Sequence, residues 1–66
     1  MYLVWVPMSS QEMIKLIKSD GWVRVATKGS HQPFTHRFKP GRVTVPHPKK
    51  SLPVGTERSI RRQAGL

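Results

Sequence analysis

Turn residues divide the middle of this chain into three short runs, and this division limits most strongly what the chain can fold into. Gly29-Ser30 marks the corner of a hairpin between a run at 22–27 and a second run at 34–38. A turn at 39–41 leads into a third run, Arg42–Pro46. The runs alternate with a period of two, which is typical of strands. We therefore expect three consecutive strands paired in one antiparallel sheet.

The same period assigns faces to the first run. Val23 and Val25 point one way and are expected to meet a helix, whereas Arg24 and Lys28 point the other way, onto the open face of the sheet. We expect Trp22 in the core or at its rim rather than as a platform for stacking bases.

The other two runs carry their own apolar positions. In the second run, Phe34 and Phe38 are expected to share a face with His36. In the third run, Val43 and Val45 are expected to point inward. Together these positions predict a small core on one face of the sheet.

A helix is expected on each side of the strands. Ser9 and Glu12 have the spacing of a capping box, which predicts a helix over 10–19. Thr56 is expected to cap a second helix, at 57–64. The predicted fold is α+β in the order α-β-β-β-α, with a three-stranded antiparallel sheet and two helices packed on one face.

The length of 66 residues suits one small domain. Residues 1–7 are almost wholly apolar and are predicted to be an N-terminal extension of a domain at 8–66. Seven residues cannot span a bilayer, which takes about 20, and they lack the basic flank of a signal peptide. The absence of cysteine excludes disulfides and thiolate metal sites and fits a cytoplasmic protein.

The charge is strongly positive, with 12 Lys and Arg against 3 Asp and Glu, for a net charge of +9. Most of the excess lies in residues 34–66. Such a field favours nucleic acid, an acidic membrane or an acidic protein. A merely solubilising surface is the alternative, but +9 exceeds the magnitude of roughly 2–8 that solubility asks of a small domain.

His31 is the first candidate for chemistry, because it follows the predicted hairpin corner and an imidazole can both accept and donate a proton near neutrality. RNA carries its own nucleophile, the 2′-hydroxyl, so its cleavage needs a base, an acid and cations for the developing charge. His31 with the nearby Lys28 and Arg24 could supply these functions.

The other two histidines are weaker candidates. His36 is expected to be a packing or rim residue, while His47 could contact a phosphate or act as a second proton carrier. Three histidines without a carboxylate cluster argue poorly for zinc. Ser30 adjoins His31, but no carboxylate is evident to orient the ring as in a serine hydrolase. We therefore predict no metal and no cofactor.

An ordered series of motifs across residues 8–66 resembles the HicA family of toxins. After a capped helix, the motifs are Asp20-Gly21-Trp22, Lys28-Gly29-Ser30-His31-x-x-Phe34, Val43-Thr44-Val45-Pro46-His47-Pro48, Leu52-Pro53-x-Gly55-Thr56 and Arg61-x-Gln63-Ala64-Gly65-Leu66. Each is weak alone, and their order is specific.

The resemblance implies an mRNA interferase of a type II toxin–antitoxin system, with a fold similar to the double-stranded-RNA-binding domain. Members cleave mRNA without a metal, and the histidine of the Gly-Ser-His motif, here His31, is the catalytic one. A HicB antitoxin covers the site and contacts operator DNA, so the toxin meets that DNA only through its antitoxin. One departure is Gln32, where members often carry a second histidine.

RNA contacts are expected from basic and turn residues around the corner and beyond the third run. These are Arg24, Lys28, Gly29, Ser30, Arg37, Lys39, His47, Lys49 and Lys50. Two alternatives stay open: a non-catalytic RNA-binding module, and the basic half of a protein complex with no enzymatic role. The sequence does not decide whether His31 acts as base or acid.

Overall fold

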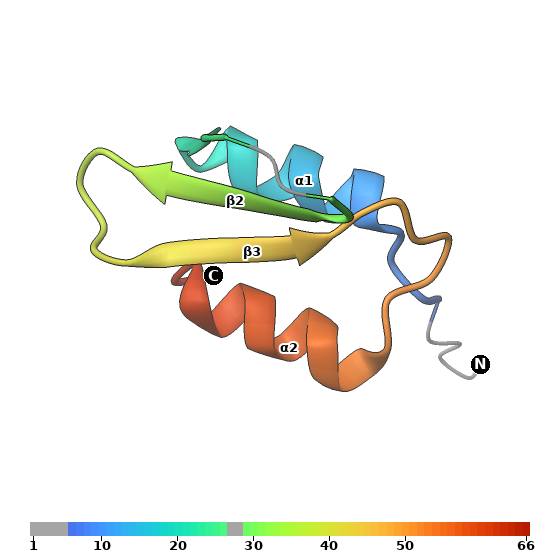
Figure 1. Cartoon of the computed structure of the whole chain (residues 1–66). Helices are drawn as coiled ribbons and strands as arrows, with labels where there is room; N and C mark the ends of the chain where they lie inside the picture. Colours follow the sequence, from blue (N-terminus) through green and yellow to red (C-terminus); the bar gives the residue numbers. More distant parts are fainter. Residues whose placement is uncertain (1–5, 27–28) are drawn as a thin grey trace.

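The computed structural model describes residues 6–26 and 29–66 and has the predicted order of helix, three strands and helix (Figure 1). The elements are α1 (Ser10–Ser19), β1 (Trp22–Arg24), β2 (His31–His36), β3 (Arg42–Pro46) and α2 (Val54–Gln63). The sheet order is β1-β2-β3 and both strand pairs are antiparallel, so the predicted α+β fold is confirmed. Of the predicted extension, only Val6 and Pro7 are described, and both are exposed.

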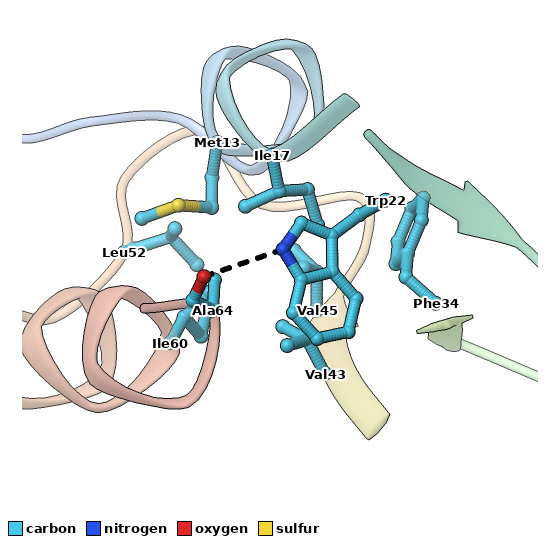
Figure 2. Packing of buried hydrophobic residues seen from close by; sticks show 9 residues of the cluster. All are labelled: Met13, Ile17, Trp22, Phe34, Val43, Val45, Leu52, Ile60 and Ala64. Atoms are coloured by element: carbon cyan, nitrogen blue, oxygen red, sulfur yellow. Dashed lines mark hydrogen bonds between the residues drawn. The ribbon is translucent and has the colours of Figure 1, made fainter. Parts of the chain in front are cut away.

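Both helices cover the same face of the sheet. One cluster of nine buried residues contains side chains of both helices, all three strands and the loop before α2: Met13, Ile17, Trp22, Phe34, Val43, Val45, Leu52, Ile60 and Ala64 (Figure 2). Phe34 lies directly opposite Val43 in the register, so their side chains share this face. The opposite face of the sheet has no helix on it in the part of the chain that is described.

The faces predicted for the first strand are wrong. Trp22 is 1% exposed, whereas Val23 is 63% exposed on the opposite face. Arg24 pairs with Phe34 and therefore lies on the helix side instead of the open face. The larger indole buries more apolar surface than a valine, and its Nε1–H donates to the carbonyl of Ala64 over 3.3 Å.

The second strand begins earlier than predicted, at His31, and ends at His36. Phe38 follows the strand and is 84% exposed, so it does not share the inner face with Phe34. The chain turns because the backbone N–H groups of Phe38 and Lys39 both donate to Nδ1 of His36, at 2.9 and 3.1 Å.

The two helices differ in how well local signals define them. The capping box of α1 is present, with Ser9 Oγ accepting from the Glu12 amide and the Glu12 side chain accepting from the Ser9 amide. The prediction for α2 is wrong at its start, because Pro53 rather than Thr56 occupies the N-cap and no side chain caps the helix. Its C-terminus closes on Gly65 at φ 72°, where a left-handed residue is needed.

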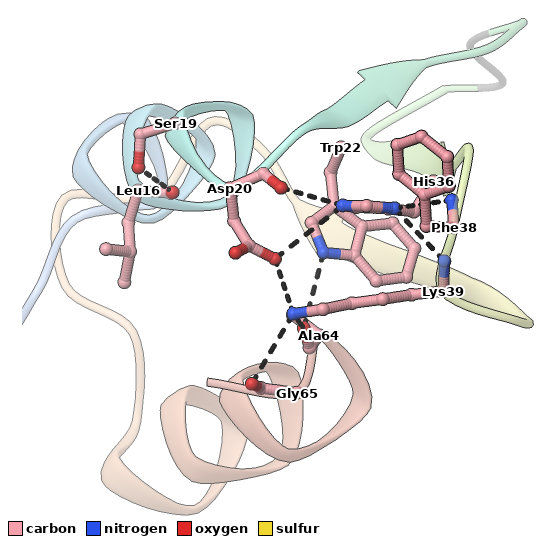
Figure 3. A network of polar contacts seen from close by, with 9 residues as sticks. All are labelled: Leu16, Ser19, Asp20, Trp22, His36, Phe38, Lys39, Ala64 and Gly65. Atoms are coloured by element: carbon pink, nitrogen blue, oxygen red, sulfur yellow. Dashed lines mark hydrogen bonds and ion pairs between the residues drawn. The ribbon is translucent and has the colours of Figure 1, made fainter.

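A polar network joins the C-termini of the two helices to the turn after β2 (Figure 3). Nζ of Lys39 lies 2.6 Å from Oδ2 of Asp20 and donates to the carbonyl of Ala64 at 2.9 Å. His36 packs edge-on against Trp22, and its Nε2 lies 2.7 Å from the carbonyl oxygen of Asp20. Because Nδ1 accepts two backbone N–H groups, His36 is a neutral Nε2–H imidazole with a structural role.

Replacing Phe34 by Ala should reduce the free energy of unfolding by about 3–5 kcal/mol, because it opens a cavity in the shared core. Phe38→Ala is the matched control, since the same atoms are removed from an exposed position. Chemical denaturation of both variants measures the difference, and equal effects would contradict the packing described here.

The ion pair of Asp20 with Lys39 should make stability depend on acid. The Lys39 ammonium donates to the Asp20 carboxylate and holds the pKa of Asp20 below its usual 3.8. A depressed folded-state pKa gives stability that is present above the unfolded value and lost as pH falls through the folded value. The free energy of unfolding, measured from neutral pH down to about pH 2, should therefore fall less steeply for Asp20→Asn and for Lys39→Met than for wild type.

A residual slope in those variants is expected from Glu12, whose pKa the capping box also lowers from 4.5. If the free energy of unfolding falls equally with acid in wild type and in Asp20→Asn, the ion pair does not contribute to the pH dependence of stability.

Candidate functional site

His31 is the first residue of β2 and lies exposed at the hairpin corner. It pairs with Pro46, whereas its neighbour Gln32 pairs with the buried Val45. Alternation along the strand therefore puts the His31 ring on the side of the sheet away from the helices. No hydrogen bond joins this ring to another residue of 6–26 or 29–66, unlike the rings of His36 and His47.

The corner is tied to the segment that follows β3. The backbone N–H of His47 donates to the carbonyl of Ser30 over 2.7 Å, which holds the residue before His31 against this segment. Gly29 has φ 59°, a conformation that glycine adopts readily, and both Gly29 and Ser30 are exposed. Lys28, predicted to bind RNA, lies outside the described residues.

His47 is half-buried and is held by α1. Its Nδ1 lies 2.8 Å from Oγ of Ser10, a residue that is itself buried. The same Oγ accepts from the amide of Lys49 at 2.8 Å and lies 3.2 Å from the Lys49 carbonyl. The imidazole is thus anchored through one nitrogen, and Nε2 is the nitrogen left for another partner.

Two open hollows meet at His47. The larger, about 520 Å³, lies between α1 and the ends of β1 and β2, and includes Lys15, Lys18, Arg24 and Gln32 in its lining. The smaller, about 490 Å³, includes Lys49 and Lys50. His47 lines both, and we call the two together the basic groove.

The basic groove brings together four of the predicted RNA contacts: Arg24, His47, Lys49 and Lys50. Arg37 is exposed near Phe38 and is not in its lining, and the ammonium of Lys39 is engaged by Asp20 and α2. His31 is not in the lining either.

Lys15, Lys18 and the anchoring Ser10 were missed as candidate site residues. The two lysines lie off the apolar stripe of α1 at i, i+3 spacing, so the sequence carried a signal that they share one side of the helix. The sequence does not show what lies next to this side of the helix, because that depends on how α1 packs on the sheet.

Residues 6–26 and 29–66 contain neither a cluster of metal ligands nor a membrane-spanning helix. No three or more His, Cys, Asp or Glu side chains gather there in a way that could hold a metal ion. No helix in the same residues is long and apolar enough to cross a membrane.

Comparisons with known proteins agree with this architecture. The family model described as HicA toxin of bacterial toxin-antitoxin matches residues 10–66. A solved chain of "Toxin-Antitoxin complex from Streptococcus pneumoniae" is 38% identical, with a TM-score of 0.75 over 91% of this chain and 100% of that chain. No curated protein matched.

The family match spans all five elements, the hairpin corner with His31 and the segment with His47. The structural match covers nearly the same length at an identity well above the level at which only a fold is shared. The chain therefore belongs to the HicA family of toxins of bacterial toxin–antitoxin systems.

Proposed function

We propose that this toxin is an endoribonuclease that cleaves mRNA without a metal, with His31 moving the protons. The observation that carries the proposal is an exposed imidazole at the first residue of β2, whose ring is not engaged by any other described residue. A structural histidine such as His36 has both ring nitrogens occupied. A ring intended for chemistry must instead be reachable by the substrate.

The reaction needs only groups that RNA and this chain supply. His31 removes the proton from a 2′-hydroxyl, whose oxygen attacks the adjacent phosphorus, and the P–O5′ bond breaks. The proton is returned to the leaving 5′ oxygen, so the products are a 2′,3′-cyclic phosphate and a 5′-hydroxyl. Cations near the phosphate stabilise the charge that develops on its oxygens.

The substrate contacts we propose are those that lie around the corner and in the basic groove. They are Arg24, Gly29, Ser30, His47, Lys49 and Lys50, with Lys28 and Arg37 as further predictions. Lys39 is left out because its ammonium already bonds to Asp20 and Ala64.

The proposed partner is a HicB-type antitoxin that covers the exposed corner in the cytoplasm. The similar solved chain comes from a toxin–antitoxin complex, and a net charge of +9 favours an acidic partner. Contact with operator DNA is proposed only through that antitoxin.

A non-catalytic RNA-binding module is the second candidate, favoured by a basic groove whose lining lacks His31. Such a module would bind RNA with an affinity that falls as the salt concentration rises, but it would leave labelled RNA intact.

His31→Ala should lower the rate of RNA cleavage by about 10²–10⁴-fold, because a positioned imidazole contributes that much to proton transfer. The measurement is cleavage of labelled RNA by purified toxin with EDTA present, alongside circular dichroism to verify folding. Phe38→Ala, which changes another exposed aromatic ring, is the control and should cut normally.

Equal rates for wild type and His31→Ala would remove His31 from the mechanism. Loss of wild-type cleavage in EDTA would contradict a metal-independent reaction. RNA that stays intact under all conditions would favour the non-catalytic RNA-binding module.

A further inference from the structure

We infer that the basic groove is the path of the RNA backbone, with Lys15 and Lys18 of α1 and the Nε2 of His47 as phosphate contacts. The inference rests on the proposed function, because it names where the substrate of that reaction lies. It adds the flank of α1 to a site that the sequence placed only on the hairpin and on the segment after β3.

The cations of the groove are available to a ligand. Within the described residues, the acidic groups that form ion pairs are Asp20, with Lys39, and Glu57, with Arg61. Lys15, Lys18 and Arg24 are in none of these pairs. Glu12 also lines the groove, but its carboxylate accepts from the Ser9 amide in the capping box.

The cations are arranged on facing walls. Lys15 and Lys18 lie at i, i+3 on α1, a spacing that puts their Cβ atoms about 5–6 Å apart on one side of the helix. Across the groove, Nη1 of Arg24 donates to Oε1 of Gln32 over 3.2 Å, which orients the guanidinium. A polyanion lying between these walls would meet positive charge on both sides.

His47 stands where the two hollows meet, and Ser10 fixes its orientation. In the protonated ring, Nδ1–H donates to Oγ of Ser10 and Nε2–H donates to the ligand. Ser10 can accept this bond because its own proton can go to the carbonyl of Lys49, 3.2 Å away. A phosphate oxygen is a suitable acceptor for the second bond.

The groove also leads to the proposed catalytic residue. The 2.7 Å bond from the His47 amide to the Ser30 carbonyl places His47 beside the residue that precedes His31. An RNA strand that follows the groove past His47 therefore comes to the hairpin corner, where the His31 ring lies on the other side of the sheet.

The composition of the lining favours RNA backbone over a segment of the antitoxin. Among the described residues that line the larger hollow, Ile14 is the single apolar side chain, whereas the centre of a protein interface is depleted in charge and rich in apolar and aromatic groups. Backbone phosphates need only cations and hydrogen-bond donors.

The test measures binding without cleavage, by fluorescence anisotropy of a labelled single-stranded RNA with toxin carrying His31→Ala. Adding Lys15→Gln and Lys18→Gln should reduce the slope of log affinity against log salt by about 1.4, two phosphate contacts at about 0.7 each. The matched control is Arg58→Gln with Arg62→Gln, which removes the same charge from exposed positions on α2. The control slope should stay unchanged.

The same assay examines His47 with two amides. Gln places its amide near the position of Nε2, and Asn places it near Nδ1 while lacking any group at Nε2. His47→Asn should therefore weaken binding about fivefold more than His47→Gln, the loss of one hydrogen bond. The reverse order would contradict a phosphate contact through Nε2.

Equal slope changes for the α1 and α2 double variants would overturn the inference while leaving cleavage by His31 intact. An α1 double variant that binds RNA normally but binds the antitoxin weakly would assign the groove to the partner and also overturn it. If the Lys15, Lys18 and His47 variants weaken RNA binding as predicted but the wild-type toxin never cleaves RNA, the groove is supported and the proposed reaction is contradicted.

Discussion

The burial of Trp22 determines the rest of this structure. Its indole is 1% exposed, packs edge-on against His36 at 5.1 Å and donates to the carbonyl of Ala64 at the end of α2. Three elements thereby meet on one side chain, and that contact decides which face of the sheet the helices cover. In a chain of 66 residues few other side chains are large enough to do this.

Once the buried face of the sheet is fixed, the strand register determines on which side of the sheet each functional residue lies. Residues in phase with Trp22, including Arg24 and Gln32, lie on the side of α1 and line the basic groove. His31 is out of phase and is left on the open side at the corner. The proposed chemistry and the proposed binding surface thus lie on the two sides of one strand end, joined through the bond between His47 and Ser30.

Local signals were sufficient where a few neighbouring residues decide the structure. The capping box of α1 and the bounds of β3 follow from short-range rules, and they are as predicted. The faces of β1 were predicted wrongly because a period of two does not say which face is buried. Lys39 was predicted as a phosphate contact, and only the folded chain brings Asp20 and α2 to its ammonium. His31 was predicted from its place after the hairpin corner and from the chemistry of imidazole, and the family resemblance implied the same role. The basic groove could not be predicted, because it forms only when α1 packs beside the ends of β1 and β2.

The central claim is that the protein supplies proton transfer while the RNA supplies the nucleophile. The most direct measurement maps the bond that the toxin cuts in an oligoribonucleotide and then repeats the reaction with a single 2′-deoxy sugar on the 5′ side of that bond. The account predicts a 2′,3′-cyclic phosphate from the ribose substrate and no cleavage of the deoxy substrate at that bond. Cleavage of both at the same rate would contradict it.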